Sequence, residues 1–168
     1  EGPPRRGISM FLVLPTDPGF RRGGTYEIVG LRAAGVGWFA LEDCFVPEDR
    51  LVGELDRGFY QMMAMVEFGR TNVAGICVGI AQAAYDVART YALERRAFGH
   101  RIGDFQAIQH KLADMSMELD AARLLVYRAA WLKQQGRSHT EEGAKAKLFA
   151  SEMARRQTAE AIQVLGGY

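Results

Sequence analysis

Features that often reveal a protein's environment are scarce in this chain of 168 residues. It has only two cysteines, Cys44 and Cys77, and their spacing fits no metal site. We therefore expect both to be small buried apolar residues in a reducing compartment. The formal net charge is only +1, so the whole molecule carries no field that attracts nucleic acid. Any anion site must therefore be local.

Long apolar runs are also missing from the sequence. No stretch approaches the ~20 residues of a membrane span, and no signal peptide is visible. We therefore expect no membrane association, and a location in the cytoplasm or in the mitochondrial matrix of a eukaryote. Hydrophobic residues make up 48% and charged residues 24% of the chain, which is typical of a globular domain that buries a core. The chain starts without a methionine and resembles a piece of something longer.

The first 50 or so residues are predicted to be β-structure. Three apolar or alternating stretches indicate strands, and Gly-rich or Pro-rich segments such as "TDPGF" and "RRGG" punctuate them. The stretches are "ISMFLVLP", "TYEIVG" and "GWFALEDCFVP". Because three strands do not form a stable sheet alone, this segment needs partners from elsewhere.

Three long helices are predicted after this segment. The first begins near Gly58, and its apolar stripe follows steps of three and four residues: Phe59, Met62, Val66, Arg70, Val73, Cys77, Ile80, Ala84, Val87 and Tyr91. The seam of the second is Phe105, Ile108, Leu112, Met115, Leu119, Ala122, Val126 and Ala129. The third carries inward Ala146, Phe149, Ala150, Met153, Ala161, Ile162 and Leu165.

The ends of these helices are also marked in the sequence. Gly136 is expected to end the second helix. The hydroxyls of Ser138 or Thr140 are expected to cap the third, which the pair Gly166-Gly167 would stop. Three antiparallel helices indicate an up-down bundle, which usually has four members, so one helix is missing from this sequence.

Two features interrupt the first helical stripe. Arg70 occupies an apolar position, and Glu67 lies one helical turn before it. The two side chains either form a structural pair or line a ligand pocket. Gly69, Gly75 and Gly79 also lie inside this helix, although each costs up to ~1 kcal/mol relative to alanine. They allow either close approach of another backbone or room for a flat ligand.

A cluster of cations follows the first helix in "LERRAFGHRIGDFQAIQ". One interpretation is a helix end, with Gly99 as the C-cap and Arg95, Arg96 and His100 complementing the helix dipole. The other is an anion site of phosphate size. In that case Asp104 would cap the second helix, whose free N–H groups would point into the same corner.

These segments together resemble the acyl-CoA dehydrogenase family of flavoproteins. The stretch "RTNVAGICVGIAQAAYDVARTYALERRAFGHRIGDFQAIQHKLADM" is similar to the C-terminal domain of the family. "GISMFLVLPTDPGF", "ALEDCFVPEDRLVGE" and "AIQVLGGY" match it in the expected order. The resemblance implies an α+β fold, with the end of a middle β-domain in residues 1–53. Residues 54–168 would form three of the four helices of a C-terminal bundle.

The resemblance also implies which residues bind the cofactor FAD. Arg95 would hold the FAD diphosphate of an adjacent subunit, and Phe98 and Gln106 would line the same site. The family's Q-x-x-GG segment would contact the adenosine part of FAD; it corresponds here to Gln163, Val164, Leu165, Gly166 and Gly167. Family members are usually homotetramers, built as dimers of dimers, and electron-transfer flavoprotein would be the electron acceptor.

Glu67 and Arg70 match family positions that contact the CoA portion of an acyl-CoA substrate. The usual catalytic base lies beyond the Q-x-x-GG segment. In a subset of the family it precedes the matching arginine, where this chain has Gly69. The chain is therefore expected to contain no catalytic base and to be inactive by itself. We also expect no metal site.

The activity implied by the resemblance is FAD-dependent α,β-dehydrogenation of an acyl-CoA thioester. Two alternatives stay open. One is a flavin-dependent oxidase or monooxygenase on the same scaffold. The other is a non-catalytic helical assembly module, in which the cations from Arg95 to Arg101 would meet acidic groups of a partner.

Overall fold

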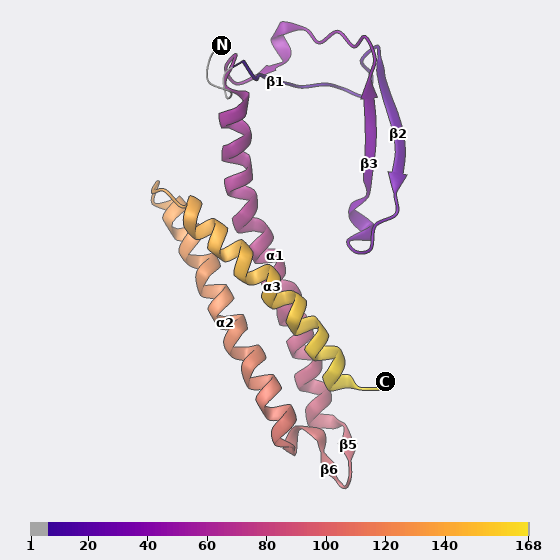
Figure 1. The fold of residues 1–168 in the computed structure, drawn as a ribbon, viewed down its shortest axis with the longest axis vertical. Coiled ribbons are helices and arrows are strands. Elements are labelled where there is room, and N and C mark those ends of the chain that lie inside the picture. Colours follow the sequence, from indigo (N-terminus) through magenta and orange to yellow (C-terminus); the bar gives the residue numbers. More distant parts are fainter. Residues whose placement is uncertain (1–6, 168) are drawn as a thin grey trace. The chain divides into compact units, whose positions relative to one another are not determined.

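The computed structural model describes residues 7–167, which fall into two compact units that divide between Met63 and Ala64. The first unit contains short strands, and the second contains long helices (Figure 1). Helix α1 (Gly58–Glu94) begins in the first unit and continues through the second. No helix in the described range is long and apolar enough to cross a membrane.

The first unit consists of two antiparallel strand pairs. Strand β1 (Met10–Phe11) pairs with β4 (Leu51–Val52), and β2 (Phe20–Tyr26) pairs with β3 (Val36–Leu41). Short 3-10 turns cover Arg32–Ala34 (η1) and Glu48–Arg50 (η2). The prediction of β-structure in this region is confirmed, whereas its assignment to the end of a larger β-domain stays a prediction.

The predicted strand boundaries were wrong around "RRGG". These residues lie inside β2, whereas Glu27–Gly30 of the expected strand lie outside it. Gly23 explains the difference, because a Cβ at this position would collide with the indole of Trp38 on β3. Glycine therefore marks a site of close cross-strand packing here and not a turn.

An ion pair between Asp17 and Arg50 stabilises the first unit. The Asp17 carboxylate, only 8% exposed, accepts hydrogen bonds from the guanidinium of Arg50 at 2.5 and 2.6 Å and from the N–H of Leu14 at 2.7 Å. The hydrogen bond from Arg50, followed by that from Leu14, lowers the pKa of Asp17 below its ordinary value. This pair joins the loop before β2 to the turn before β4.

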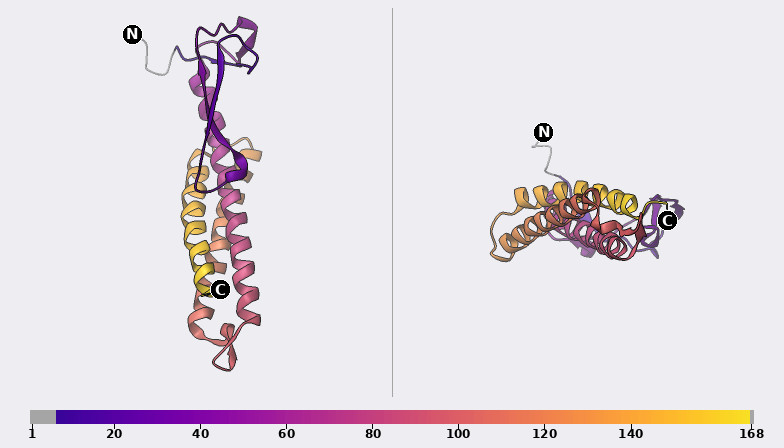
Figure 2. Two further views of the ribbon diagram at one scale, coloured as in Figure 1. Left: turned by 90° about the vertical axis from the view of Figure 1, so that its right-hand side faces the viewer. Right: turned by 90° about the horizontal axis from the view of Figure 1, so that it is seen from below.

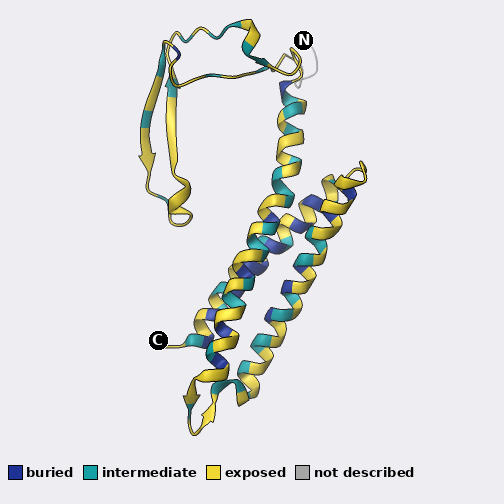
Figure 3. Cartoon of the chain, turned by 180° about the vertical axis from the view of Figure 1, so that it is seen from behind, coloured by how far each residue is buried: buried dark blue, intermediate teal, exposed yellow. Residues whose placement is uncertain are grey.

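The second unit is an antiparallel three-helix arrangement. Residues 64–94 of α1 lie beside α2 (Gln106–Gln134) and α3 (Thr140–Leu165) (Figures 1 and 2). All three helices contain buried residues, whose positions are coloured dark blue on the ribbon in Figure 3. Most of them are small, and the larger of the two core clusters contains Ala74, Ala81, Leu119, Ala122, Ala129, Ala146, Ala150, Met153 and Ala154.

The predicted inner stripe of α1 was wrong in its orientation. Half of its members are exposed, namely Met62, Val66, Val73, Ile80 and Val87, and only Cys77 and Ala84 pack against the core clusters of the described residues. The face that packs on α2 and α3 carries alanines instead, at positions 74, 81, 88 and 92. Small side chains let helices approach closely, and their low hydrophobicity concealed this face in the sequence pattern. The fourth helix of a bundle stays a prediction.

The predictions for α2 and α3 agree better with the structure. Met115, Leu119, Ala122 and Ala129 of the α2 seam are buried, but Ile162 of α3 is 70% exposed, contrary to expectation. The left-handed Gly136 follows the end of α2, as predicted, and its N–H donates to the carbonyl of Lys133 at 3.0 Å.

Two further expectations from the sequence need correction. Helix α3 begins at Thr140, but its N-cap residue is His139, which makes no side-chain cap, and the Thr140 hydroxyl bonds elsewhere. Cys44 and Cys77 are both free, and each is half-buried, not fully buried. Cys77 packs against the edge of the larger core cluster.

Candidate functional site

The cation cluster lies on a hairpin that the sequence patterns did not predict. Helix α1 ends at Glu94, and strands β5 (Arg96–Ala97) and β6 (His100–Arg101) pair directly after it. The two residues at the turn, Phe98 and Gly99, have φ angles of +52° and +81°. A two-residue turn with positive φ at both positions suits the twist of a hairpin. Gly99 therefore forms the hairpin turn, and the C-cap interpretation was wrong.

Phe98 is held in an unfavourable conformation at the tip of this hairpin. A positive φ costs a residue with a bulky side chain on the order of 1–2 kcal/mol. Its ring is 94% exposed and touches Phe105 only edge-on, with the centroids 6.4 Å apart. Burial in this chain therefore does not compensate for the strain. An exposed aromatic ring in a strained turn is typical of a binding surface.

The charges on the hairpin are arranged unfavourably. Arg96 lies directly opposite Arg101 in the ladder, and like charges at such positions destabilise a strand pair. The Asp104 carboxylate lies 3.8 Å from the guanidinium of Arg101 and accepts a hydrogen bond from the backbone N–H of Arg101 at 3.2 Å. Within residues 7–167, neither Arg95 nor Arg96 belongs to an ion pair. This arrangement favours an external anion.

The predicted cap on α2 is absent. The N-cap residue is Phe105, whose side chain cannot accept a hydrogen bond, and Asp104 instead closes the preceding 3-10 turn η3 (Ile102–Asp104). The first N–H groups of α2 are therefore without a side-chain cap. Gln106 is the first residue of this helix and is exposed.

A cavity of about 320 Å³ brings Arg95 next to the end of α3. Its walls are Tyr91, Arg95, Ile102, Val164, Leu165, Gly166 and Gly167. Arg95 and four of the five predicted residues of the Q-x-x-GG segment thus lie together, although about 70 residues separate them in the sequence. Phe98, Gln106 and Gln163 are exposed and do not line this cavity.

Two cavity residues were missed by the sequence reasoning. Tyr91 lies one turn before Arg95, and its carbonyl accepts the Arg95 N–H at 2.8 Å. Helical spacing could have identified it as a neighbour of Arg95. Ile102 carried no comparable signal, because its position depends on the unpredicted hairpin.

Glu67 and Arg70 occupy a different part of α1. About 25 residues separate Arg70 from Arg95, which corresponds to roughly 38 Å along a helix. The Glu67 carboxylate accepts a hydrogen bond from the Thr140 hydroxyl at 2.6 Å. In the described residues no ion pair includes Arg70, so the structural Glu67–Arg70 pair does not form.

The three glycines in the interior of α1 face open space. A Cβ at Gly69, Gly75 or Gly79 would meet no atom within 4 Å among the described residues. Gly75 and Gly79 line a groove of about 310 Å³ beside Tyr127 of α2. Nothing in the described part of the chain approaches these positions closely.

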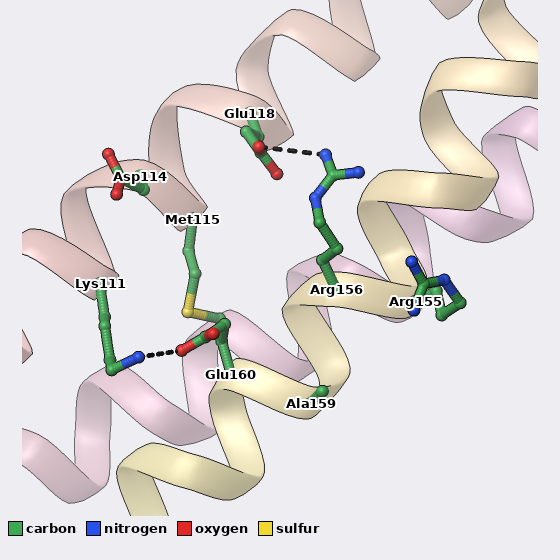
Figure 4. Close-up of a pocket in the computed structure, with 8 residues that line it drawn as sticks. All are labelled: Lys111, Asp114, Met115, Glu118, Arg155, Arg156, Ala159 and Glu160. Carbon is green, nitrogen blue, oxygen red and sulfur yellow. Dashed lines mark hydrogen bonds and ion pairs between the residues drawn. The ribbon is translucent and has the colours of Figure 1, made fainter.

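A second groove, of about 360 Å³, lies between α2 and α3 (Figure 4). Its charged side chains are mostly paired with one another: Lys111 with Glu160, and Glu118 with Arg156 at 3.1 Å. Ion pairs that satisfy each other leave little charge for a ligand. No group of acidic, histidine or cysteine residues within 7–167 could hold a metal ion.

Comparison with known proteins shows which family the chain resembles. The model of the family described as "Acyl-CoA dehydrogenase, C-terminal domain" matches residues 56–168. A probable acyl-CoA dehydrogenase of Bacillus subtilis, YngJ, is 48% identical over 163 residues, which cover 96% of this chain and 43% of the relative. CarC, a subunit of the caffeyl-CoA reductase–Etf complex of Acetobacterium woodii, is 42% identical over 97% of this chain and 43% of the relative.

A solved structure shows the same fold. The butyryl-CoA dehydrogenase of Megasphaera elsdenii superposes with a TM-score of 0.94 and is 40% identical. The match covers 98% of this chain and 43% of the solved chain. The chain therefore spans less than half the length of the relatives that it matches.

Proposed function

Because the chain belongs to the acyl-CoA dehydrogenase family of FAD-dependent oxidoreductases, we propose that the complete protein oxidises the Cα–Cβ bond of an acyl-CoA thioester. The observation that carries the proposal is the juxtaposition of Arg95, which forms no ion pair among the described residues, with the segment from Val164 to Gly167 around one cavity. In this proposal the chain binds cofactor and substrate, and it supplies no catalytic base.

The residues around this cavity fit a dinucleotide. Arg95 provides a guanidinium that has no ion-pair partner in the part of the chain that the structure describes. It suits a diphosphate because charge-assisted hydrogen bonds to phosphate are strong. Gly166 has a φ of +67° and Gly167 meets nothing within 4 Å, so the backbone there is open to a ligand. Phe98 and Gln106 would line the diphosphate side, and Gln163 to Gly167 would contact the adenosine part.

The adjacent hairpin supports the same assignment. The like-charged positions Arg96 and Arg101, and the strained backbone and exposed ring of Phe98, are disadvantages in the chain alone. A bound anion would offset the repulsion, and a flat group would cover the exposed ring. We further propose that these residues face the FAD of a neighbouring subunit in a homotetramer.

Glu67 and Arg70 would form the substrate side of the chain. Arg70 has no ion-pair partner in the described part of the chain, and its guanidinium would bind a phosphate of CoA. When FAD is bound it supplies the acceptor for the hydride that leaves Cβ of the acyl group. The carboxylate that takes the α-proton is expected outside this chain, since Gly69 cannot take a proton.

Removing Arg95 tests the cofactor assignment. Arg95→Ala in the full-length protein should weaken FAD binding about 10-fold or more, because a hydrogen bond to a charged group contributes about 1.5–3 kcal/mol. The ratio of flavin to protein absorbance after gel filtration measures this change. Arg89→Ala is the matched control, because Arg89 is an exposed cation near the end of α1, the helix that Arg95 directly follows. Equal flavin content in both variants would contradict the assignment.

Two alternatives can be separated from this proposal by simple measurements. Fast reoxidation of the reduced flavin by oxygen in stopped flow would favour an oxidase or monooxygenase, and slow reoxidation favours a dehydrogenase. A colourless full-length protein that still oligomerises would favour an assembly module. We expect a yellow protein with slow reoxidation.

The partners follow from the same proposal. Electron-transfer flavoprotein would accept the electrons, and the relative CarC, named as part of an Etf complex, supports this choice. The protein would act in the cytoplasm, or in the mitochondrial matrix of a eukaryote.

A further inference from the structure

Residues on both sides of the turn between α2 and α3 contact α1 close to Glu67 and Arg70. The ammonium group of Lys133, at the end of α2, lies 3.3 Å from the centre of the Phe68 ring. Thr140, the first residue of α3, donates its hydroxyl to Glu67 at 2.6 Å. Both contacts join residues far apart in the sequence, and they hold one short stretch of α1 from the same side.

Close backbone packing supports these two contacts. Gly143 is buried, and a Cβ built there would lie 3.4 Å from the hydroxyl of Thr71 and 3.9 Å from Cβ of Arg70. The first turn of α3 therefore rests directly on the turn of α1 that carries Arg70. The position of the Thr140 hydroxyl relative to Glu67 is thus fixed by the packing of two helices.

The hydrogen bond from Thr140 determines which group the Glu67 carboxylate contacts. Residues three apart on a helix are neighbours, so a free Glu67 carboxylate would ordinarily be attracted to the guanidinium of Arg70. The Glu67 carboxylate instead accepts the Thr140 hydroxyl, and no ion pair within residues 7–167 includes Arg70. The cation is left free although an acidic neighbour lies within one turn.

We propose that Thr140 is a positioning residue that holds Glu67 away from Arg70 and so keeps this guanidinium available to a phosphate group of CoA. The inference rests on the proposed function, because Arg70 is assigned to CoA binding there. It adds a residue from α3 to the substrate side and gives the packing of the α2–α3 turn against α1 a specific consequence. Without the hydroxyl, Glu67 competes with the ligand for Arg70.

A pair of substitutions at position 140 tests the hydroxyl. Thr140→Val keeps the shape of the side chain and removes the donor, whereas Thr140→Ser keeps the donor. In the full-length, FAD-loaded protein, Thr140→Val should weaken CoA binding in calorimetry about two- to fivefold, the effect of one exposed ion pair that must be broken. KM for an acyl-CoA should rise by the same factor with kcat unchanged, and Thr140→Ser should behave like the parent protein.

Repeating Thr140→Val in a Glu67→Gln protein distinguishes a positioning role of Thr140 from a general structural effect. Glutamine at position 67 carries no charge to attract Arg70, so Thr140→Val should cause no further loss of CoA affinity in a Glu67→Gln protein. A double-mutant cycle measures this coupling directly. An equal loss in both backgrounds, or an unchanged affinity in Thr140→Val alone, would overturn the inference.

Failure of the proposed function would look different. A parent protein that binds FAD but neither binds CoA nor oxidises any acyl-CoA would remove the assignment of Arg70, and with it this inference. A parent protein that binds CoA normally, with no effect of Thr140→Val, would leave the proposed function intact and reject only the role of Thr140.

Discussion

Replacing Gln157 with methionine should stabilise the helical unit. Gln157 lies in α3 and is 1% exposed. Its side-chain N–H donates to the carbonyl of Met115 on α2 at 2.7 Å, but its side-chain oxygen has no hydrogen-bond partner among the described residues. The amide is therefore only half satisfied in the core.

The expected gain follows from two opposing terms. Relieving an unsatisfied buried acceptor is worth about 1–3 kcal/mol, and losing the hydrogen bond to Met115 costs about 0.5–1.5 kcal/mol. Glutamine and methionine have similar helix propensities and similar lengths, so other terms nearly cancel. The free energy of unfolding should rise by about 1 kcal/mol, which corresponds to roughly 2–4 °C in Tm for a chain of this size.

Urea unfolding followed by far-UV circular dichroism would measure this difference. Gln157→Ala should have the opposite effect and lower stability by about 2 kcal/mol or more, because it leaves a cavity. Gln134→Met, at the exposed end of α2, should change stability by less than about 0.5 kcal/mol. A loss of more than about 1 kcal/mol in Gln157→Met would show that the amide oxygen has a partner and would refute the reasoning.

Other predictions concern glycines and pH. Gly79→Ala should raise stability by about 0.5–1 kcal/mol in urea unfolding, because a Cβ there meets nothing within 4 Å. Gly103→Ala should lower it by about 1–3 kcal/mol, since its Cβ would lie 2.9 Å from the carbonyl oxygen of Ala92. The pKa of Asp17 is lowered on folding, mainly by the hydrogen bond from Arg50, so its stabilisation is complete above the unfolded value near 3.8 and is lost as the pH falls through the folded pKa. Acid titration of Asp17→Asn should therefore show a weaker pH dependence than the parent protein.

The long helices could be predicted from the sequence because helix formation is largely a local matter. The seam from Met115 to Ala129 and the stop at Gly136 depend on spacing within one element and on the conformational freedom of glycine. The spacing of apolar residues in α1 also identified Arg70 as a charged residue at an apolar position. The resemblance of the motifs pointed to the residues around Arg95 that we propose bind FAD.

The orientation of α1 could not be found in the same way. Its bulky stripe and its alanine stripe are both periodic, and a periodic pattern does not say which neighbours will pack on which face. Only the packing of α2 and α3 decided that the alanines at 74, 81 and 88 are buried. The hairpin after Glu94 was missed because phenylalanine is an uncommon residue at a position with positive φ.

The amino-acid sequence by itself determined the three helices and their extent, the stop at Gly136 and the residue types available for an anion. The tertiary structure alone decided that Arg95 meets the segment from Val164 to Gly167, and that Thr140 rather than Arg70 holds Glu67. The physical reason is the distance along the sequence over which each interaction acts. Backbone propensity and periodicity act over a few residues, whereas these contacts join residues about 70 positions apart and exist only because three helices pack against one another.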